Sequence, residues 1–398
     1  MADVIKSTLR SSYDSLDRIV TAIGQPVRLA VDAFGASTDY ARLSRYHHRI
    51  RDTFVRHQPA IKVEEYIGTG GFADVFRARS EYDGVKDFAI KILRRDLMRR
   101  GAARDGNEEE MRIKDVKKRF SNEAYTQWHL SQSLSRRVAE SVVRVYDHGE
   151  FDSREGFRFI LMERMGSTLR DFIEDPTNYA DDYDLLMYKS VLMTKVADIV
   201  ANVHSEGVFH RDIKPENILF PTGDDSGEEA VPESPAKRTA RNIRVKLADF
   251  GTVRWIKSYT DKYDGVIIGS QFYMSPEQIF HPGRLDPRTD IYSFGVVCFE
   301  LLYGRHPKGV DRTTPRLLEK LARKKPEHPR PPKGFEPLDK IIHTCMADLG
   351  DRYQTMGEVV SRLREFNAHL VGTSGPYPAG RARAGTTREE KDADGNRG

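Results

Sequence analysis

A cluster of polar residues stands between two apolar runs in the segment VFHRDIKPENILF, residues 208–220. Asp212 supplies a carboxylate, Lys214 a cation and Asn217 an amide oxygen within this short stretch. Held together on one loop, such groups can position a hydroxyl, neutralise a transferred phosphoryl group and hold a metal ion. One segment of this kind is only suggestive, so its interpretation depends on the rest of the chain.

Two segments nearer the N-terminus have residue types that suit a bound phosphate. Residues 67–75, IGTGGFADV, predict a strand, a glycine turn and a second strand. Glycines let the backbone approach phosphates because no Cβ intervenes, although such a hairpin is more often a plain turn. In residues 88–93, FAIKIL, Lys91 is flanked by apolar residues and needs a countercharge, which Glu123 on a predicted helix can supply.

A further segment lies downstream of the polar cluster. Residues 245–251, VKLADFG, predict an apolar strand that ends at Asp249. Beside Asn217, this carboxylate would complete a pair of hard oxygen ligands of the kind that suits Mg²⁺. Asp-Phe-Gly can also be a simple turn, but its place in order with the other segments argues against that interpretation.

Together these segments resemble the eukaryotic-type (Hanks-type) serine/threonine protein kinases, over roughly residues 60–370. The resemblance implies an α+β, bilobal fold, with a small β-rich N-lobe that includes the αC helix and a larger, mainly helical C-lobe. It also implies ATP as the phosphoryl donor, Mg²⁺ as the cofactor and proteins as substrates. The sequence DIKPEN favours Ser or Thr over Tyr as the acceptor.

The resemblance assigns the nucleotide to the glycine turn, the strand of Lys91 and the hinge between the lobes. Lys91 would contact the α and β phosphates, and Glu123 would brace it. In FILMERM, residues 159–165, Met162 would lie at the back of the adenine pocket, although a methionine there is also an ordinary core residue. The implied nucleotide-binding residues are Ile67, Gly68, Gly70, Gly71, Val75, Ala89, Lys91, Met162, Glu163 and Met165, the last two through backbone hydrogen bonds.

The same resemblance assigns the catalytic roles. Asp212 would orient the substrate hydroxyl and accept its proton, and Lys214 would steady the γ-phosphate. Asn217 and Asp249 would hold Mg²⁺. Near the hinge the chain has Thr168 and no acidic residue in its place. The sequence therefore gives no ground to predict a preference for basic substrates.

Other matching residues would support this machinery. Glu277 in SPE corresponds to the end of the activation segment and should pair with Arg352. Asp290 resembles the buried helix carboxylate that receives the backbone of the catalytic loop. His210 and Phe250 are interpreted as core packing that ties the loop to the C-lobe.

Regulation by activation-loop autophosphorylation is implied by Arg211, because a guanidinium can pair bidentately with phosphate. The candidate acceptors are Ser258 and Thr260, with Tyr263 less favoured, although exposed loop hydroxyls are usually unmodified. Ser270 stands where the family usually has a threonine near the substrate site.

Two residues depart from the family pattern. The third glycine of the turn is replaced by Ala73, a change that can retune nucleotide binding. Gln127, one helical turn after Glu123, stands where the family prefers an apolar residue of the packed active state. This predicts a helix that reaches its active position only with a partner or a phosphate. The N-terminal helices could provide that control.

The chain also has extensions and insertions. Apolar residues at helical spacing, broken by glycine and proline, predict short amphipathic helices near the N-terminus. Charged and polar composition predicts surface loops at 94–118 and 221–241. We expect a helical N-terminal extension at residues 1–58 and a kinase domain at 59–370, with the N-lobe at 59–163 and the C-lobe at 164–370. The kinase domain would carry a polar insertion at 221–241, and a disordered tail would follow at 371–398.

Composition narrows the partners. The 64 basic and 60 acidic residues nearly balance, with a net charge of +4, so nucleic acid is not the expected partner. No apolar run approaches a membrane span and residues 1–10 lack a signal-peptide core, so we expect a soluble, cytoplasmic protein without membrane contact. Cys298 and Cys345 lie in apolar surroundings and are predicted to be core thiols. A regulator or a second copy could bind residues 1–58.

Two other functions share these motifs. A pseudokinase scaffold usually lacks the equivalent of Lys91, Asp212 or Asp249, and this chain has all three. A small-molecule phosphotransferase with a kinase-like cleft usually lacks an SPE-type segment with its arginine partner. Both features favour a protein kinase.

Overall fold

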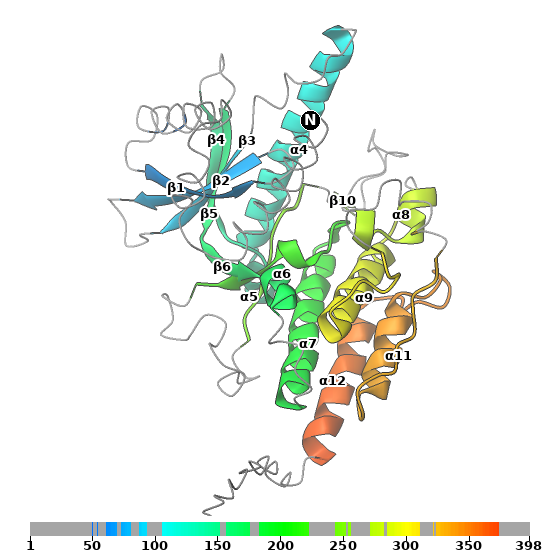
Figure 1. The fold of residues 1–398 in the computed structure, drawn as a ribbon. Coiled ribbons are helices and arrows are strands. Elements are labelled where there is room, and N and C mark those ends of the chain that lie inside the picture. Colours follow the sequence, from blue (N-terminus) through cyan, green and yellow to red (C-terminus); the bar gives the residue numbers. More distant parts are fainter. Residues whose placement is uncertain are drawn as a thin grey trace, which may run out of the picture.

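The computed structural model describes most of two lobes and leaves out the termini and several connections. The described residues are 50, 54, 61–69, 73–80, 87–93, 106–151, 157–175, 183–222, 243–251, 254–255, 271–281, 285–310, 321 and 324–373. The predicted bilobal α+β architecture is confirmed, with a sheet and one long helix in the N-lobe and a helical C-lobe (Figure 1).

A five-stranded antiparallel sheet forms the N-lobe, in the order β1-β2-β3-β5-β4. Its strands are β1 (Ile61–Thr69), β2 (Ala73–Ser80), β3 (Phe88–Leu93), β4 (Val145–Phe151) and β5 (Phe157–Glu163). Because strand side chains alternate between faces, Ile90 and Ile92 of β3 enter one apolar cluster, whereas Leu93 enters another. Lys91 therefore points to the face that carries Leu93.

Helix α4 (Gly106–Ser131) covers the Leu93 face of the sheet, where Phe120 and Ala124 join the apolar cluster. The prediction of a loop at 94–118 is wrong for residues 106–118, which form the first half of this helix, and residues 94–105 lie outside the described part. Charge density suggested a loop, but Glu, Lys, Arg and Met are also good helix formers. The i,i+4 pair Asp115–Arg119, with N and O 2.9 Å apart, supports the helix.

The opposite face of the sheet is covered by residues upstream of β1. Ile50 and Phe54, four positions apart in sequence, are 1% and 2% exposed and join the cluster formed by Ile90 and Ile92. The Phe54 ring packs edge-on against Phe159, with centroids 5.4 Å apart. These two residues of the predicted N-terminal extension are thus part of the N-lobe core, and its other residues lie outside the described part.

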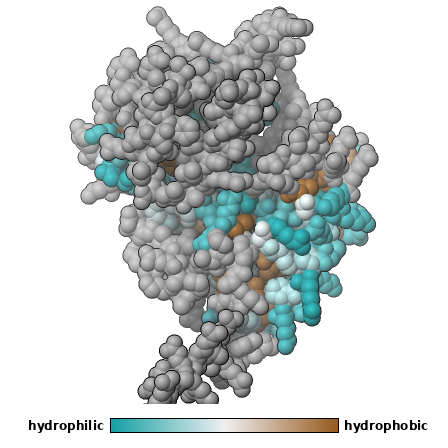
Figure 2. All heavy atoms as spheres, in the orientation of Figure 1, coloured by the Kyte–Doolittle hydropathy of each residue, from teal (hydrophilic) through white to brown (hydrophobic). Residues whose placement is uncertain are grey.

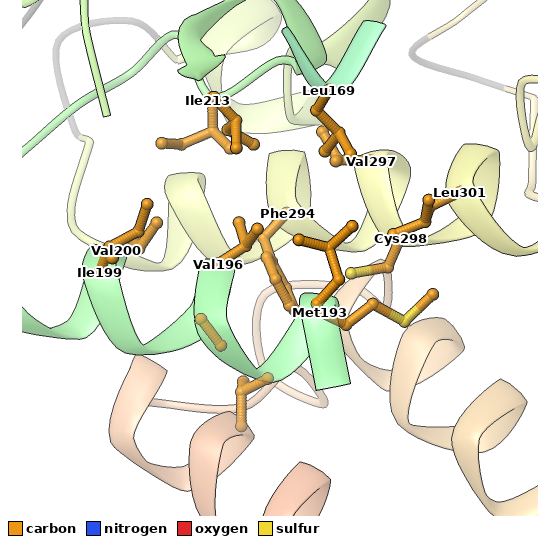
Figure 3. Close-up of a cluster of buried hydrophobic side chains, with 14 of the residues drawn as sticks. Leu169, Met193, Val196, Ile199, Val200, Ile213, Phe294, Val297, Cys298 and Leu301 are labelled. Carbon is orange, nitrogen blue, oxygen red and sulfur yellow. The ribbon is translucent and has the colours of Figure 1, made fainter. Parts of the chain in front are cut away.

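The C-lobe is a helical bundle around α7 (Tyr183–Ser205) and α9 (Arg288–Tyr303), which pack against α12 (Met356–Thr373) and α11 (Glu336–Cys345) respectively. Figure 3 shows its core, where Met193 and Val196 of α7 meet Phe294 and Val297 of α9. Ile213 of the catalytic loop also enters this cluster and fixes that loop to the bundle. Further helices are α5 (Arg136–Ser141), α6 (Leu169–Glu174) and α8 (Pro276–Phe280), with 3₁₀ turns η3 (Pro215–Asn217) and η7 (Gln271–Tyr273).

Two small sheets hold the segments around the catalytic loop. One has the order β6-β8-β9 and the other pairs β7 with β10. These strands are β6 (Met165–Thr168), β7 (Val208–Phe209), β8 (Ile218–Pro221), β9 (Lys246–Leu247) and β10 (Arg254–Trp255). The apolar runs on either side of the polar cluster at 208–220 thus form β7 and β8, as the sequence indicated.

The surface of the described C-lobe helices is mainly hydrophilic on the face shown in Figure 2. No helix in the described part of the chain is long and apolar enough to cross a membrane. Cys298 and Cys345 are free and buried, as predicted. Helix α12 continues to Thr373, so residues 371–373, predicted as tail, are helical, and residues 374–398 lie outside the described part.

Candidate active site

A lysine of the N-lobe sheet contacts two carboxylates from other elements. Lys91 Nζ lies 2.5 Å from Oε1 of Glu123 on α4 and 3.5 Å from Oδ1 of Asp249, which follows β9. The side chains of Lys91 and Glu123 are 15% and 6% exposed, whereas that of Asp249 is 42% exposed. Asp249 therefore faces the more open side of this charge cluster.

One ammonium shared by two carboxylates shifts all three titrations. Burial alone would lower the pKa of Lys91, but Asp249 and Glu123 outweigh it and raise the pKa. Burial, aided by the charge of Asp249, raises the pKa of Glu123 to about 7 despite the opposing effect of Lys91. Burial would also raise the pKa of Asp249, yet Lys91 and then Lys214 lower it. Asp249 is thus held ionised, while Glu123 titrates near neutrality.

The loop between β7 and β8, predicted to be catalytic, brings the predicted polar residues together. Lys214 Nζ lies 2.9 Å from Oδ2 of Asp212. Asn217 Nδ2 donates to the backbone oxygen of Asp212 at 2.9 Å and to its Oδ2 at 3.3 Å. Burial lowers the pKa of Lys214, but the carboxylate of Asp212 raises it overall, so the cation is maintained.

The loop backbone is held in an uncommon conformation. Arg211 has a φ of 68°, in the left-handed region that non-glycine residues rarely adopt. The fully buried Asp290 of α9 accepts the amide protons of His210 and Arg211 at 2.6 and 2.7 Å, and it contacts His204 Nε2 at 2.9 Å. Gln278 Nε2 donates to the carbonyl of Arg211 at 2.9 Å. These contacts offset the strain and fix the loop.

Asp249 also has a positive φ, of 64°, and the residue after it anchors the turn. The rings of Phe250 and His210 are fully buried and pack edge to face, with centroids 4.9 Å apart. His210 Nε2 lies 3.0 Å from the carbonyl oxygen of Ala248, while its Nδ1 accepts from the amide of Asp212 at 3.3 Å. Two residues interpreted as packing thus join the Asp212 loop to the Asp249 turn.

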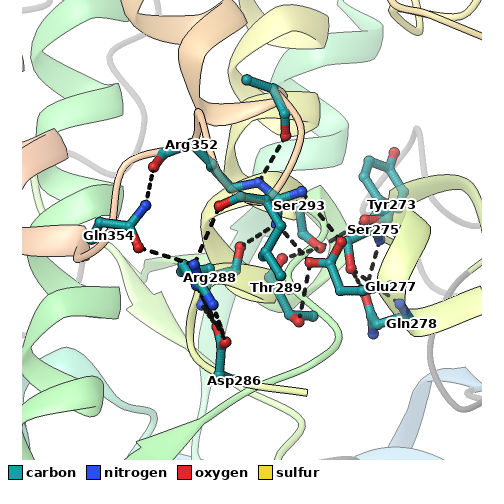
Figure 4. A network of polar contacts seen from close by, with 12 residues as sticks. Tyr273, Ser275, Glu277, Gln278, Asp286, Arg288, Thr289, Ser293, Arg352 and Gln354 are labelled. Carbon is teal, nitrogen blue, oxygen red and sulfur yellow. Dashed lines mark hydrogen bonds and ion pairs between the residues drawn. The ribbon is translucent and has the colours of Figure 1, made fainter. Parts of the chain in front are cut away.

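The pair predicted between Glu277 and Arg352 lies in a buried network (Figure 4). Arg352 Nη1 donates to Oε1 of Glu277 at 2.6 Å, and Nη2 donates to Oε2 at 3.3 Å. The remaining bonds of Arg352 go to the carbonyl oxygens of Arg288 and Ala347 at 2.9 and 3.1 Å. Because Glu277 lies in the first turn of α8, this network fixes the end of the segment that contains SPE.

The hinge strand lies beside the nucleotide-contacting residues that the family implies. Met162 of β5 pairs in register with Ala89 of β3, and Val75 of β2 pairs with Lys91. The amide of Glu163 donates to the carbonyl of Arg144 at 2.8 Å. Because this amide is engaged, the predicted backbone hydrogen bond between Glu163 and a base would use the carbonyl oxygen of Glu163.

The glycine turn is only partly described. Ile67 is 42% exposed, and a Cβ added at Gly68 would meet nothing within 4 Å, so this end of β1 is open. Gly70 and Gly71 lie outside the described residues, as do Ser258, Thr260, Tyr263 and Ser270. Met165 is half-buried in β6, at the start of the C-lobe.

The two departures from the family pattern have structural consequences. Ala73 is 2% exposed, and its methyl group joins the apolar cluster between the sheet and α4. Gln127 is 1% exposed, and its Nε2 donates to the carbonyl of Val143 at 3.0 Å. The amide of Val143 in turn donates to the carbonyl of Leu247, directly before the Asp249 turn, at 3.0 Å. A polar contact therefore joins α4 to Val143, which in turn bonds to β9 of the C-lobe, where the family pattern predicted apolar packing.

Sequence reasoning missed two cations that contact the site. Lys246 Nζ lies 2.6 Å from Oε2 of Glu163 and joins the hinge to β9. Arg170, the second residue of α6, contacts Glu216 in the catalytic loop. The available signal for Arg170 resembled the one used for Lys91, a cation near apolar residues, here Leu169 before it and Phe172 two residues after it.

The oxygen atoms fit a metal that keeps much of its own water. The described residues contain no group of three or more His, Cys, Asp or Glu side chains that could hold a metal ion. Asn217 and Asp249 offer two hard oxygen ligands, and Mg²⁺ is commonly bound through one or two protein ligands plus waters and substrate phosphates. The donor set is therefore compatible with Mg²⁺ and not with a closed, all-protein metal site.

Two lobes, a lysine–glutamate pair and an Asp-Lys-Asn loop are features that protein kinases share. The family model of the protein kinase domain matches residues 61–360, so the chain belongs to the protein kinase family.

Similar proteins include bacterial kinases. A probable serine/threonine-protein kinase of Corynebacterium efficiens is 30% identical over 320 residues, which cover 77% of this chain and 41% of that protein. The probable serine/threonine-protein kinase PknB of Corynebacterium glutamicum is 29% identical over 325 residues, 78% and 42% of the two chains. PrkC of Bacillus subtilis is 29% identical over 305 residues, 75% and 39%. The chain thus spans about two-fifths of the length of these relatives.

Proposed function

We propose that this protein is a serine/threonine protein kinase that transfers the γ-phosphate of ATP to Ser or Thr hydroxyls of proteins. The supporting observation is the contact of Lys91 with both Glu123 and Asp249, which brings α4 and the Asp249 turn to the N-lobe sheet. This arrangement leaves a cation available to nucleotide phosphates and a partly exposed carboxylate beside it.

The proposed chemistry follows from the loop. Asp212 accepts the proton of the acceptor hydroxyl as its oxygen bonds to the γ-phosphorus, and the bond from that phosphorus to the bridging oxygen of ADP breaks. Lys214, 2.9 Å from Asp212, neutralises charge on the transferred group. Protein kinases use Mg²⁺, and Asn217 and Asp249 would hold it, where it would offset phosphate charge.

The nucleotide site would use the glycine turn, β3 and the hinge. We assign Lys91 to the α and β phosphates and Met162 to the back of the base pocket. The proposed nucleotide contacts are Ile67, Gly68, Gly70, Gly71, Val75, Ala89, Lys91, Met162, Glu163 and Met165.

Regulation and location are proposed from other residues. Arg211 would pair with phosphate on Ser258 or Thr260 after autophosphorylation, and residues 1–58 would bind a regulator or a second copy. Ile50 and Phe54 are buried against the N-lobe sheet, on the face opposite α4, so this segment could act on the N-lobe through the sheet. The free thiols Cys298 and Cys345 suit a reducing compartment, so we propose a cytoplasmic location for this chain.

The decisive experiment is phosphate transfer from labelled ATP with Mg²⁺, to the protein itself and to a generic basic protein. We expect label on Ser or Thr that disappears in Asp212→Asn. Asp198→Asn is the matched control, because Asp198 pairs with Arg364 on the C-lobe surface at 2.7 Å and should leave transfer unchanged. Nucleotide binding without any transfer would contradict the kinase and favour a scaffold, and label on a small molecule alone would favour the other phosphotransferase class.

A further inference from the structure

A buried arginine contacts the catalytic loop from the C-lobe side. Arg170 is 6% exposed, and its Nε donates to Oε1 of Glu216 at 3.0 Å. Its Nη2 contacts the hydroxyl of Tyr273 and donates to Oε2 of Glu300 at 3.0 Å. The Tyr273 hydroxyl donates to the same oxygen of Glu300 at 2.7 Å. We call these four residues the Arg170 cluster.

The cluster lies where a substrate chain would flank its acceptor residue. Glu216 stands in η3 between Lys214 and Asn217, and both of these neighbours contact Asp212. A peptide whose hydroxyl reaches Asp212 therefore passes within side-chain reach of Glu216, whose side chain is 35% exposed although its Oε2 is buried. Glu300 is 8% exposed, so a substrate side chain has far less access to it.

Charge decides what Glu216 can offer to a substrate. A carboxylate beside an acceptor site ordinarily attracts arginine or lysine, because hydrogen bonds between ionised groups are among the stronger ones. Here Glu216 is already paired with a cation of the protein itself, Arg170. A substrate guanidinium that reached Glu216 would also meet the charge of Arg170, and the repulsion would offset much of the attraction.

We propose that Arg170 is a specificity-determining residue that occupies Glu216 from within the protein, so that substrates need no arginine or lysine beside the acceptor Ser or Thr. The inference rests on the proposed kinase function and narrows its substrate class. Arg170 acts through Glu216 rather than on the acceptor hydroxyl of the substrate.

The test compares peptides that differ in one charge. Each carries a single Ser acceptor and either Arg or Gln at one position, from four residues before the acceptor to four after it. The protein should show less than about threefold difference in kcat/KM between Arg and Gln peptides at every position. In Arg170→Gln combined with Glu300→Gln, at least one position should favour Arg by about tenfold or more, the size of one charge-assisted hydrogen bond.

The double variant is chosen so that folding does not obscure the result. Arg170→Gln alone would leave the carboxylate of Glu300 buried beside no cation, whereas Glu300→Gln removes that charge and can still accept from Tyr273. Adding Glu216→Gln to the double variant should abolish the new preference for Arg. Glu216→Gln alone should leave the small selectivity of the unaltered protein unchanged.

Two results would overturn the proposal. One is a tenfold or greater preference for Arg in the unaltered protein that Glu216→Gln removes, because Glu216 would then be open to substrates. The other is a double variant that gains no preference. Anisotropy of the labelled peptides gives the same comparison without turnover, so absence of transfer would count against the kinase function alone while binding still decides the role of Arg170.

Discussion

Two ion pairs between residues far apart in sequence have similar lengths but different surroundings. Lys91 Nζ lies 2.5 Å from Glu123 in the N-lobe, and Arg352 Nη1 lies 2.6 Å from Glu277 in the C-lobe. Lys91 is shared with a second carboxylate, that of Asp249, whose side chain is 42% exposed. Arg352 is 1% exposed at its side chain and directs its other bonds to two backbone carbonyls.

The comparison teaches that two ion pairs of similar length can have different roles: one can exchange a partner for a phosphate, and the other stays in place. Around Lys91 there is one cation for two carboxylates, so an arriving phosphate can replace a contact without leaving the cation unpaired. Around Arg352 both carboxylate oxygens of Glu277 are engaged, and a bidentate guanidinium pair has a defined geometry. Breaking the first pair should therefore affect activity, and breaking the second should affect stability.

The largest expected effect is on the C-lobe pair. Arg352→Met should lower the free energy of unfolding by about 3–5 kcal/mol, because Glu277 would remain as a buried charge without its partner. Urea unfolding at fixed pH measures the change, and nucleotide affinity of the folded protein should stay the same. Arg362→Met is the matched control, since Arg362 pairs with Glu365 at 3.0 Å on the exposed surface of α12 and should shift stability by no more than about 0.5 kcal/mol. Equal shifts in the two variants would refute the contrast.

The next effect is on the N-lobe pair. Lys91→Met should lower kcat/KM by about 10²–10³-fold, the usual loss when one preorganised charge contact is removed. Stability should change far less than in Arg352→Met, because Glu123 can take up a proton once its cation is gone. Steady-state kinetics and thermal melting measure the two quantities, with Lys62→Met on the exposed edge of β1 as the control. A large loss of melting temperature with retained activity would reverse the assignment of the two pairs.

A smaller effect is expected at the polar contact that holds α4. Gln127→Ala leaves the carbonyl of Val143 without its side-chain donor in a buried site, which should cost about 1–3 kcal/mol. If the contact also positions Glu123, the loss in kcat/KM should be larger than the loss in nucleotide affinity. Gln132→Ala is the matched control, because exposed Gln132 makes the longer bond to Val145, at 3.4 Å. Identical behaviour of the two variants would show that Gln127 does not position α4.

The smallest effect is the pH dependence of the shared charge. Because the pKa of Glu123 is raised to about 7, kcat/KM should fall by up to about tenfold per pH unit as pH drops below that value and the ion pair with Lys91 is lost. Folded protein then binds more protons than unfolded protein between the ordinary value of 4.5 and about 7, so the stability that Glu123 contributes decreases as pH rises across this window. Glu123→Gln should lack both changes, and a pH profile with the same inflection in that variant would assign it to another group.

Much of the site was predictable because its reactive residues lie close together in short segments of the sequence. Asp212, Lys214 and Asn217 lie on one loop, and the apolar runs beside them became β7 and β8. The loop expected at 94–118 was wrong from residue 106 onward, because charged residues favour an exposed helix as much as a loop. The role of Gln127 was missed because its partner, the carbonyl of Val143, is a backbone group that no side-chain pattern marks.

The sequence by itself determined which charges the protein has for its chemistry, and in what order: Lys91, Glu123, Asp212 and Asp249. Only the tertiary structure decided which of these charges compensate one another. It made Lys91 the shared partner of two carboxylates and set Arg170 against Glu216. The physical reason is that electrostatic energy depends on distance through space and on burial, and neither follows from separation along the chain.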